Sequence, residues 1–292
     1  MSSEVIASPS VRRLALEKGI DLDARARTLG RNTLAREDLM DASGAAPAAD
    51  TALWDVDHGQ WGPVTEEPVS RFARAAARNL AAATAVIPSV THHDSADVTA
   101  LEAFRASLKD EAEARGAKLT ALAFHVKALA RTLRAFPRFN ASLSADGETL
   151  ILKDYVHIGI AVDAEHGLMV PVIRDADRKG LWALAAEIAD LGARARARKI
   201  APDEMGGASM SVSSLGGIGG EAFSPIINPP ELAILGITRA ETRPRWTGGT
   251  WEPALMLPLD LTYDHRVING ADAARFMRRY CDLLSDPRRM VL

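Results

Sequence analysis

One histidine of this chain lies where an acid–base group is useful. His265 is in the run YDHRVING, at the end of an alternating apolar pattern and just before the turn signal Asn269-Gly270. An imidazole has an unperturbed pKa of about 6.5, so it can accept a proton near neutral pH when a neighbour fixes its tautomer. A thiol, with a pKa of about 8.5, needs such a base to become a nucleophile. In a single sequence, however, a lone histidine is more often structural than catalytic.

Two other patterns contain residue types found in dinucleotide-binding and metal-binding sites, but the surrounding sequence does not support either site. The run Gly216–Ala222 matches the dinucleotide-binding pattern G-x-G-x-x-A, yet that pattern needs a helix directly afterwards and the following FSPIINPP cannot form one. The triplet His92-His93-Asp94 offers ligand types, but neighbouring residues rarely bind one ion without a distant third ligand. We therefore expect a tight glycine loop and no metal. We interpret Cys281, His125 and His157 as packing residues.

The composition limits the class of protein. Of the 292 residues, 47% are hydrophobic and 25% charged, with a net charge of −3, which is typical of an ordinary globular protein and indicates no nucleic-acid partner. The single cysteine excludes an internal disulfide and suits a reducing compartment, so we expect a cytoplasmic location. The N-terminus lacks an export-signal pattern, and no apolar run is long enough to span a membrane.

Hydrophobic periodicity predicts the elements that must position these residues. Spacings of three and four predict amphipathic helices at 98–108, 119–136, 181–198 and 271–285. Alternating or continuous apolar runs predict strands at 156–162, 231–237 and 255–263. These helices and strands make residues 66–292 an α/β domain of mixed character.

The N-terminal part has a different organisation. Ser8-Pro9 can begin a helix that Gly19 ends, and a second short helix is predicted at Arg36–Asp41. Residues 42–65 are rich in Ala, Pro, Gly and Asp without a sustained period, which is typical of a linker. The sequence therefore predicts a small helical domain over residues 8–41.

The string LTYDHRVINGADAARF resembles the DHRxxxG active-site motif of the dihydrolipoamide acyltransferases, the core components of 2-oxoacid dehydrogenase complexes. Further runs resemble the same family: VTHHDSADVTALEAFR, GIAVDAEHGLMVPVIRDAD, SVSSLGGIGGEAFSPIINPPELAILGI and LLSDPRRMVL. Together they cover residues 66–292. The resemblance implies a mixed-sheet catalytic domain like that of chloramphenicol acetyltransferase.

The resemblance also implies roles for individual residues. His265 would remove the thiol proton of coenzyme A, and Ser213 would stabilise the tetrahedral oxyanion, for which a preorganised donor can contribute about 3–4 kcal/mol. Ser214 is the alternative if the alignment shifts by one. Asn269 stands where many relatives have aspartate, so it would act by hydrogen bonding and orientation. Asp264 and Arg266 are interpreted as structural charges at the strand end.

The small N-terminal domain resembles the peripheral subunit-binding domain of the same acyltransferases. That domain docks dihydrolipoamide dehydrogenase or the 2-oxoacid decarboxylase through basic residues, and Arg12 and Arg13 match its basic pair. The family's central loop usually reads GTGxxGR, whereas most of these glycines are absent from Arg27–Thr33. This loop must therefore be built differently, which leaves two alternatives, a domain that docks a partner and one that no longer binds.

The acyl group, its donor and the assembly also follow from the resemblance. The run SSLGGIGGEAFSPIINPPELAILG resembles the pyruvate-type members, which favours acetyl. Relatives begin with lipoyl domains and this sequence shows none, so either the chain is shortened or a separate or fused protein supplies the lipoyl group in trans. Family members form homotrimers whose histidine and serine come from neighbouring subunits. Within one chain, Ser213 and His265 should then lie beyond hydrogen-bond reach near apolar surfaces, and Met290–Leu292 would join trimers into a cage.

Two other functions stay open at this point. The chain could be a non-catalytic scaffold that binds partners in the complex, or an acetyltransferase of the same fold with another small acceptor.

Overall fold

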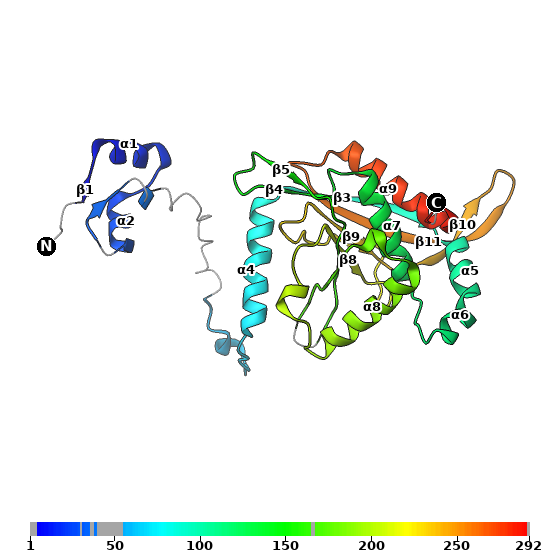
Figure 1. The fold of residues 1–292 in the computed structure, drawn as a ribbon. Coiled ribbons are helices and arrows are strands. Elements are labelled where there is room, and N and C mark those ends of the chain that lie inside the picture. The colour runs from blue at the N-terminus through cyan, green and yellow to red at the C-terminus, as the bar shows by residue number, and fades with distance from the viewer. Residues whose placement is uncertain (1–4, 30, 36–37, 40–54, 165–166, 291–292) are drawn as a thin grey trace. The chain divides into compact units, whose positions relative to one another are not determined.

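The computed structural model describes residues 5–29, 31–35, 38–39, 55–164 and 167–290. The chain divides into two compact units, Met1–Glu67 and Pro68–Leu292 (Figure 1). Of the predicted linker, residues 42–54 lie outside the described residues, and the remainder contains the 3-10 helix His58–Trp61. Within the described part of the chain, no helix is long and apolar enough to cross a membrane.

The small unit consists of short elements around its own core. It contains β1 (Ile6–Ala7), α1 (Pro9–Lys18), α2 (Leu22–Leu29) and β2 (Thr33–Leu34), and the two strands pair in parallel. The Ser8 hydroxyl caps α1 by accepting the Val11 N–H at 3.4 Å, and Gly19 ends it with φ +64°. The predicted start and end of this helix are confirmed. Most of the predicted helix Arg36–Asp41 lies outside the described residues, and α2 was not predicted.

An ion pair closes the loop that lacks the family's glycines. The Arg31 guanidinium binds the Asp38 carboxylate, which also accepts the Ala35 N–H at 2.8 Å. The Ala35 N–H and the Arg31 charge lower the pKa of Asp38. A buried carboxylate thus organises this loop through its hydrogen bonds.

The larger unit contains a mixed sheet in the order β10-β11-β9-β8-β6-β7, with β3 paired to β11. Its strands are β3 (Ser89–Asp97), β6 (Ile158–Ile160), β7 (Val172–Ile173), β8 (Met210–Ser214), β9 (Ala233–Ile237), β10 (Glu241–Trp246) and β11 (Trp251–Asp264). The β6–β8 and β8–β9 pairs are parallel, and the others are antiparallel. Strands β4 (Ala141–Leu143) and β5 (Leu150–Leu152) form a separate hairpin. The mixed sheet predicted from the sequence is confirmed.

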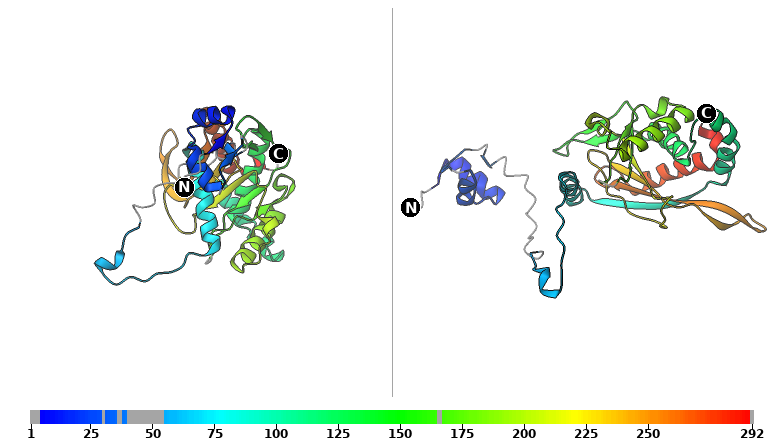
Figure 2. Two further views of the ribbon diagram at one scale, coloured as in Figure 1. Left: turned by 90° about the vertical axis from the view of Figure 1, so that its left-hand side faces the viewer. Right: turned by 90° about the horizontal axis from the view of Figure 1, so that it is seen from below.

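Helices cover one face of this sheet (Figure 2). The helices of the larger unit are α4 (Arg71–Val86), α5 (Thr99–Ser107), α6 (Lys109–Ala114), α7 (Ala121–Ala135), α8 (Leu181–Arg196) and α9 (Gly270–Ser285). Short 3-10 helices span Ala176–Arg178, Pro202–Glu204 and Pro287–Met290. Val212, Leu235, Leu259 and Leu261 belong to the core shared with α7 and α9. The next residues along each strand therefore project to the opposite face, which we call the polar face.

Three groups that could have been reactive are structural instead. His125 shares a hydrogen bond of 2.8 Å with the Tyr280 hydroxyl, both fully buried between α7 and α9. Burial lowers the pKa of His125 to about 4 and raises the pKa of Cys281 to about 12. His157 accepts the Asp175 N–H at 3.0 Å through Nδ1. The interpretation of these residues as packing residues is confirmed.

Protonation of His125 should destabilise the larger unit in acid. The imidazole pKa is about 6.5 in the unfolded chain and about 4 in the folded one. Because the unfolded state binds this proton more readily, the free energy of unfolding should fall as the pH drops from 6.5 towards 4, by up to about 3 kcal/mol. Urea titrations at pH 7 and pH 4.5, followed by tryptophan fluorescence, measure the difference.

Two substitutions identify the group responsible. His125→Gln, which cannot titrate but can still bond Tyr280, should lose this part of the pH dependence. His58→Gln, at an exposed position, should keep it. Equal pH dependence in wild type and His125→Gln would contradict the assignment.

Candidate active site

His265 follows directly after the longest strand. Its N–H donates to the Pro88 carbonyl at 3.1 Å, which ties the end of β11 to the residue before β3. The side chain is exposed, and its ring centroid lies 5.8 Å from that of Tyr263. The backbone is therefore fixed while the imidazole faces outward.

Paired charges brace the turn on both sides of this histidine. The Asp264 carboxylate is 1% exposed and accepts Arg266 Nη2–H at 2.6 Å and Nε–H at 3.0 Å. It also accepts the Arg266 backbone N–H at 3.0 Å, while the Asp264 N–H donates to the Leu232 carbonyl at 2.9 Å. The interpretation of these two residues as structural charges agrees with this geometry.

Asn269 begins the helix that follows. It is the N-cap residue of α9, and its carbonyl accepts the N–H groups of Asp272 and Ala273 at 3.0 Å each. Its side chain is exposed and makes no capping hydrogen bond. The amide is thus available to orient another group near His265.

Ser213 lies on β8, in a row that crosses four strands. It pairs with Gly236 on β9, Gly236 pairs with Asp260 on β11, and Asp260 pairs with His93 on β3. Residues paired directly across strands project to the same face. A Cβ at Gly236 would lie 3.1 Å from the Asp260 Cβ, as this predicts. Ser213 therefore projects onto the polar face, and Ser214 onto the opposite face.

The two principal candidates are far apart within one chain. Two strand spacings separate Ser213 from Asp260, and His265 follows Asp260 by five residues, so the strand geometry places the two about 20 Å apart. Exposed apolar side chains are present on the neighbouring segments, Val90 in register with Tyr263 near the end of β11 and Ile218 in the loop after β8. One chain therefore cannot bring both groups to the same reacting atom, in agreement with the expectation from the resemblance.

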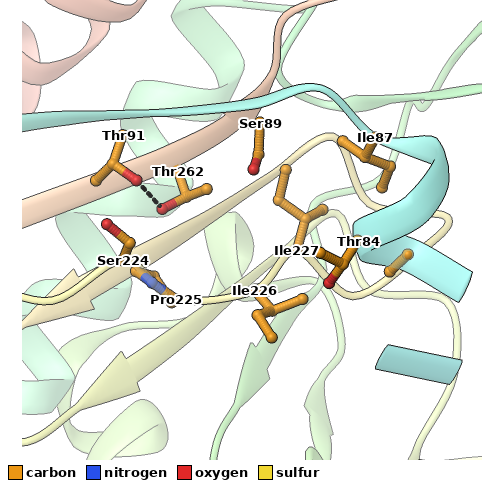
Figure 3. A pocket seen from close by; sticks show the side chains of 10 residues that line it. Thr84, Ile87, Ser89, Thr91, Ser224, Pro225, Ile226, Ile227 and Thr262 are labelled. Atoms are coloured by element: carbon orange, nitrogen blue, oxygen red, sulfur yellow. Dashed lines mark hydrogen bonds between the residues drawn. The ribbon is translucent and has the colours of Figure 1, made fainter. Parts of the chain in front are cut away.

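Two cavities adjoin the turn that carries His265. The smaller cavity has a volume of about 130 Å³ and is lined by hydroxyls of β3 and β11. Thr91 on β3 and Thr262 on β11 share a hydrogen bond of 2.9 Å there (Figure 3). Ser89, the register partner of Asp264, also lines it. The larger, of about 1120 Å³, extends between α4 and the β4–β5 hairpin to Asp264 and Arg266. The two residues on either side of His265 thus border the larger cavity.

Comparison with known proteins decides the family. The family described as 2-oxoacid dehydrogenases acyltransferase (catalytic domain) matches residues 62–292. The chain belongs to this acyltransferase family. Residues 5–25 match the e3 binding domain.

Named relatives are similar along this whole chain. The dihydrolipoyllysine-residue acetyltransferase components of the pyruvate dehydrogenase complexes of Azotobacter vinelandii and Pseudomonas aeruginosa are 47% and 46% identical over 99% of it. The chain spans 48% and 55% of these relatives, about half their length. The Bacillus subtilis component is 38% identical over 100% of this chain and 69% of its own length.

Solved structures of the family agree with the fold. A structure of Azotobacter vinelandii dihydrolipoamide acetyltransferase, determined to investigate the catalytic role of a serine, a histidine and an asparagine, has a TM-score of 0.80 and 51% identity. It covers 81% of this chain and 98% of that one. A structure of the cubic core of the pyruvate dehydrogenase multienzyme complex matches with the same values.

The basic pair and the histidine–aspartate triplet singled out in the sequence make contacts within the chain. Arg12 donates to the Val5 carbonyl at 2.9 Å and the Ala7 carbonyl at 3.2 Å, so it holds β1 against α1, while Arg13 is exposed. Asp94, the acidic residue of the triplet considered as a metal site, forms an ion pair with Arg278 at 2.9 Å. Across the described ranges, no group of three or more His, Cys, Asp or Glu side chains could hold a metal ion.

One buried acidic residue of this chain was not singled out from the sequence. Glu231 is 3% exposed, and its Oε1 accepts the Ser211 hydroxyl at 2.9 Å and the Asn228 amide N–H at 3.0 Å. Burial raises the pKa of Glu231 to about 7. Glu231 is the one charged residue of the run 231–237, which is otherwise apolar, and this feature of the sequence could have identified it. It lines the larger cavity.

Removal of Arg266 should leave a buried charge beside His265. Arg266→Ala should lower the free energy of unfolding by about 3 kcal/mol, because Asp264 would lose its ionic partner in the interior. Arg275→Ala is the control, since its pair with Asp272 is exposed on both sides (65% and 41%) and should contribute less than about 1 kcal/mol. Urea unfolding measures both, and equal losses would contradict this description.

Proposed function

We propose that this chain transfers an acyl group, in the first instance acetyl, between a dihydrolipoyl thiol and coenzyme A. The observation that carries the proposal is a shared spacing. In the Azotobacter acetyltransferase, the catalytic serine and histidine, and the histidine and asparagine, are separated by the same numbers of residues as Ser213, His265 and Asn269 here. The family and the fold support the same reaction class.

The exposed imidazole of His265 acts as the general base. It takes the proton from the coenzyme A thiol, and the thiolate attacks the carbonyl carbon of the acyl-dihydrolipoyl thioester. The tetrahedral intermediate then collapses, the carbon–sulfur bond to dihydrolipoyl breaks, and the imidazolium returns the proton to the leaving thiolate. The Asp264–Arg266 pair keeps the turn in place during both proton transfers.

Ser213 supplies the hydrogen bond to the oxyanion. It projects onto the polar face together with Asp260, whereas Ser214 projects away, which favours Ser213 over its neighbour. Because a donor must lie about 3 Å from the oxyanion, the spacing of about 20 Å within one chain supports a site that takes His265 from a second chain. We propose a homotrimer, assembled into a larger cage as in the cubic core. The C-terminal residues Met290–Leu292 were expected to join trimers into the cage. Met290 instead packs in the core of its own chain, and Val291 and Leu292 lie outside the described residues.

The small unit is proposed to dock dihydrolipoamide dehydrogenase, the 2-oxoacid decarboxylase or both. The match to the e3 binding domain supports the first partner. Arg13 is the basic residue of the predicted pair available for this role, because Arg12 binds two carbonyls of β1. The acyl donor is a dihydrolipoyl thioester, and coenzyme A is the other substrate of the reaction. A cytoplasmic location stays a prediction from the single cysteine.

His265→Ala should reduce transfer by at least about a hundredfold, because the thiol then loses its base. The assay offers acetyl-coenzyme A and dihydrolipoamide, separates the products by chromatography, and measures the S-acetyl-dihydrolipoamide and free coenzyme A that form. Asn269→Asp should retain most of the activity, because a carboxylate can still accept a hydrogen bond at this position. Near-normal turnover of His265→Ala would contradict the mechanism, and inactivity of the wild type would favour the scaffold function.

The two adjacent serines provide a matched pair. Ser213→Ala should lower kcat by about a hundredfold, the effect of removing an oxyanion donor of about 3 kcal/mol. Ser214→Ala should have little effect, because its side chain projects to the other face. A larger loss for Ser214→Ala would assign the oxyanion to that residue instead.

A further inference from the structure

The row of residues that contains Ser213 ends in a second histidine. His93 Nδ1 lies 2.6 Å from Asp260 Oδ1, and this carboxylate is 1% exposed. The imidazole itself is half exposed, with 54% of its side chain accessible. The other oxygen, Oδ2, accepts the Phe223 N–H at 3.1 Å. Asp260 therefore connects a surface histidine to a loop residue across the polar face.

Phe223 lies next to Ser213. A Cβ at Gly236 would be 2.9 Å from two atoms of the Phe223 ring, so the ring rests on the bare backbone of the strand that pairs with Ser213. One strand spacing, about 4.8 Å, separates Gly236 from Ser213. An acyl group whose carbonyl oxygen is hydrogen-bonded to Ser213 would therefore have its alkyl group beside the aromatic ring.

Hydrogen bonds hold the first part of the loop that carries Phe223. Leu215 donates to the Ile237 carbonyl at 2.8 Å where the loop leaves β8, and the Thr238 hydroxyl donates to the Glu221 carbonyl at 3.0 Å. The Phe223 N–H adds a bond to Asp260 on β11, and at the far end of the loop the Leu232 carbonyl accepts the Asp264 N–H at 2.9 Å. Because a buried carboxylate needs partners to stay in place, the orientation of Asp260 depends on His93.

We propose that Phe223 limits the size of the acyl group at Ser213, and that His93 positions Phe223 through Asp260. The proposal rests on the acyl transfer proposed above. His93 is a positioning residue and makes no contact with the acyl group. Holding the ring against Gly236 keeps the space for the alkyl group small, which favours acetyl over longer chains. The hydrogen bonds that Asp260 accepts from His93 and Phe223 thus act on the choice between acyl groups.

The test compares acyl-coenzyme A substrates in the full chain. The ratio of kcat/KM for acetyl- to butyryl-coenzyme A, with dihydrolipoamide as acceptor, should fall tenfold or more in Phe223→Ala, since methylene discrimination is about 10- to 200-fold. It should fall in the same direction in His93→Leu. His93→Asn, whose amide can still donate to Asp260, should keep most of the wild-type ratio.

Further variants separate positioning from stability. His92→Leu, on the same strand but opposite face, should leave the ratio unchanged. If His93→Leu fails to fold, the pair His93→Leu with Asp260→Leu removes both polar partners and should still lower the ratio. Amide hydrogen exchange at Phe223 should accelerate in His93→Leu but not in His93→Asn.

The outcomes distinguish this inference from the function on which it rests. A wild type that transfers no acyl group at all would contradict the proposed function. Transfer with an unchanged ratio in Phe223→Ala would overturn the role of Phe223. A changed ratio in Phe223→Ala together with an unchanged ratio in His93→Leu would overturn the role of His93.

Discussion

The pairing of β11 with its neighbours is the interaction on which the arrangement of the proposed site depends. This strand pairs with β3 along nine residues and with β9 along five, and His265 follows its last residue. The same registers align Ser213, Gly236, Asp260 and His93 across four strands. A shift by one residue would move every side chain of a strand to the other face. The registers therefore determine which face Ser213 projects to and how far Ser213 lies from His265.

The two faces of the sheet differ in chemistry, which supports the proposal that each site uses two chains. One face packs a core of aliphatic and aromatic side chains against helices, which stabilises the larger unit. The polar face bears serine, threonine and aspartate side chains bonded to one another or to the loop after β8. Its ordered hydroxyls and carboxylates are suited to substrates and to a second subunit. Stability and chemistry are thus assigned to opposite faces.

Periodicity predicted the elements that bury an apolar stripe and missed those that do not. The helices at α5, α7, α8 and α9 and the strands β6, β9 and β11 were predicted because core residues recur at their period. Strand β8 alternates the core residues Met210 and Val212 with serines, β3 contributes only Ala96 to the core, and α4 buries only Ala83. His265 and Ser213 came from the family motif, whereas the His93–Asp260 contact joins residues 167 positions apart and depends on register.

The central claim is that each site combines His265 of one chain with Ser213 of another. Co-expression of His265→Ala and Ser213→Ala chains, purified as mixed oligomers, tests it most directly. Random assembly should restore about a quarter of wild-type transfer, because one pairing in four unites an intact histidine with an intact serine across a cyclic interface. Activity no greater than that of the two separate variants would show that the site does not lie between chains.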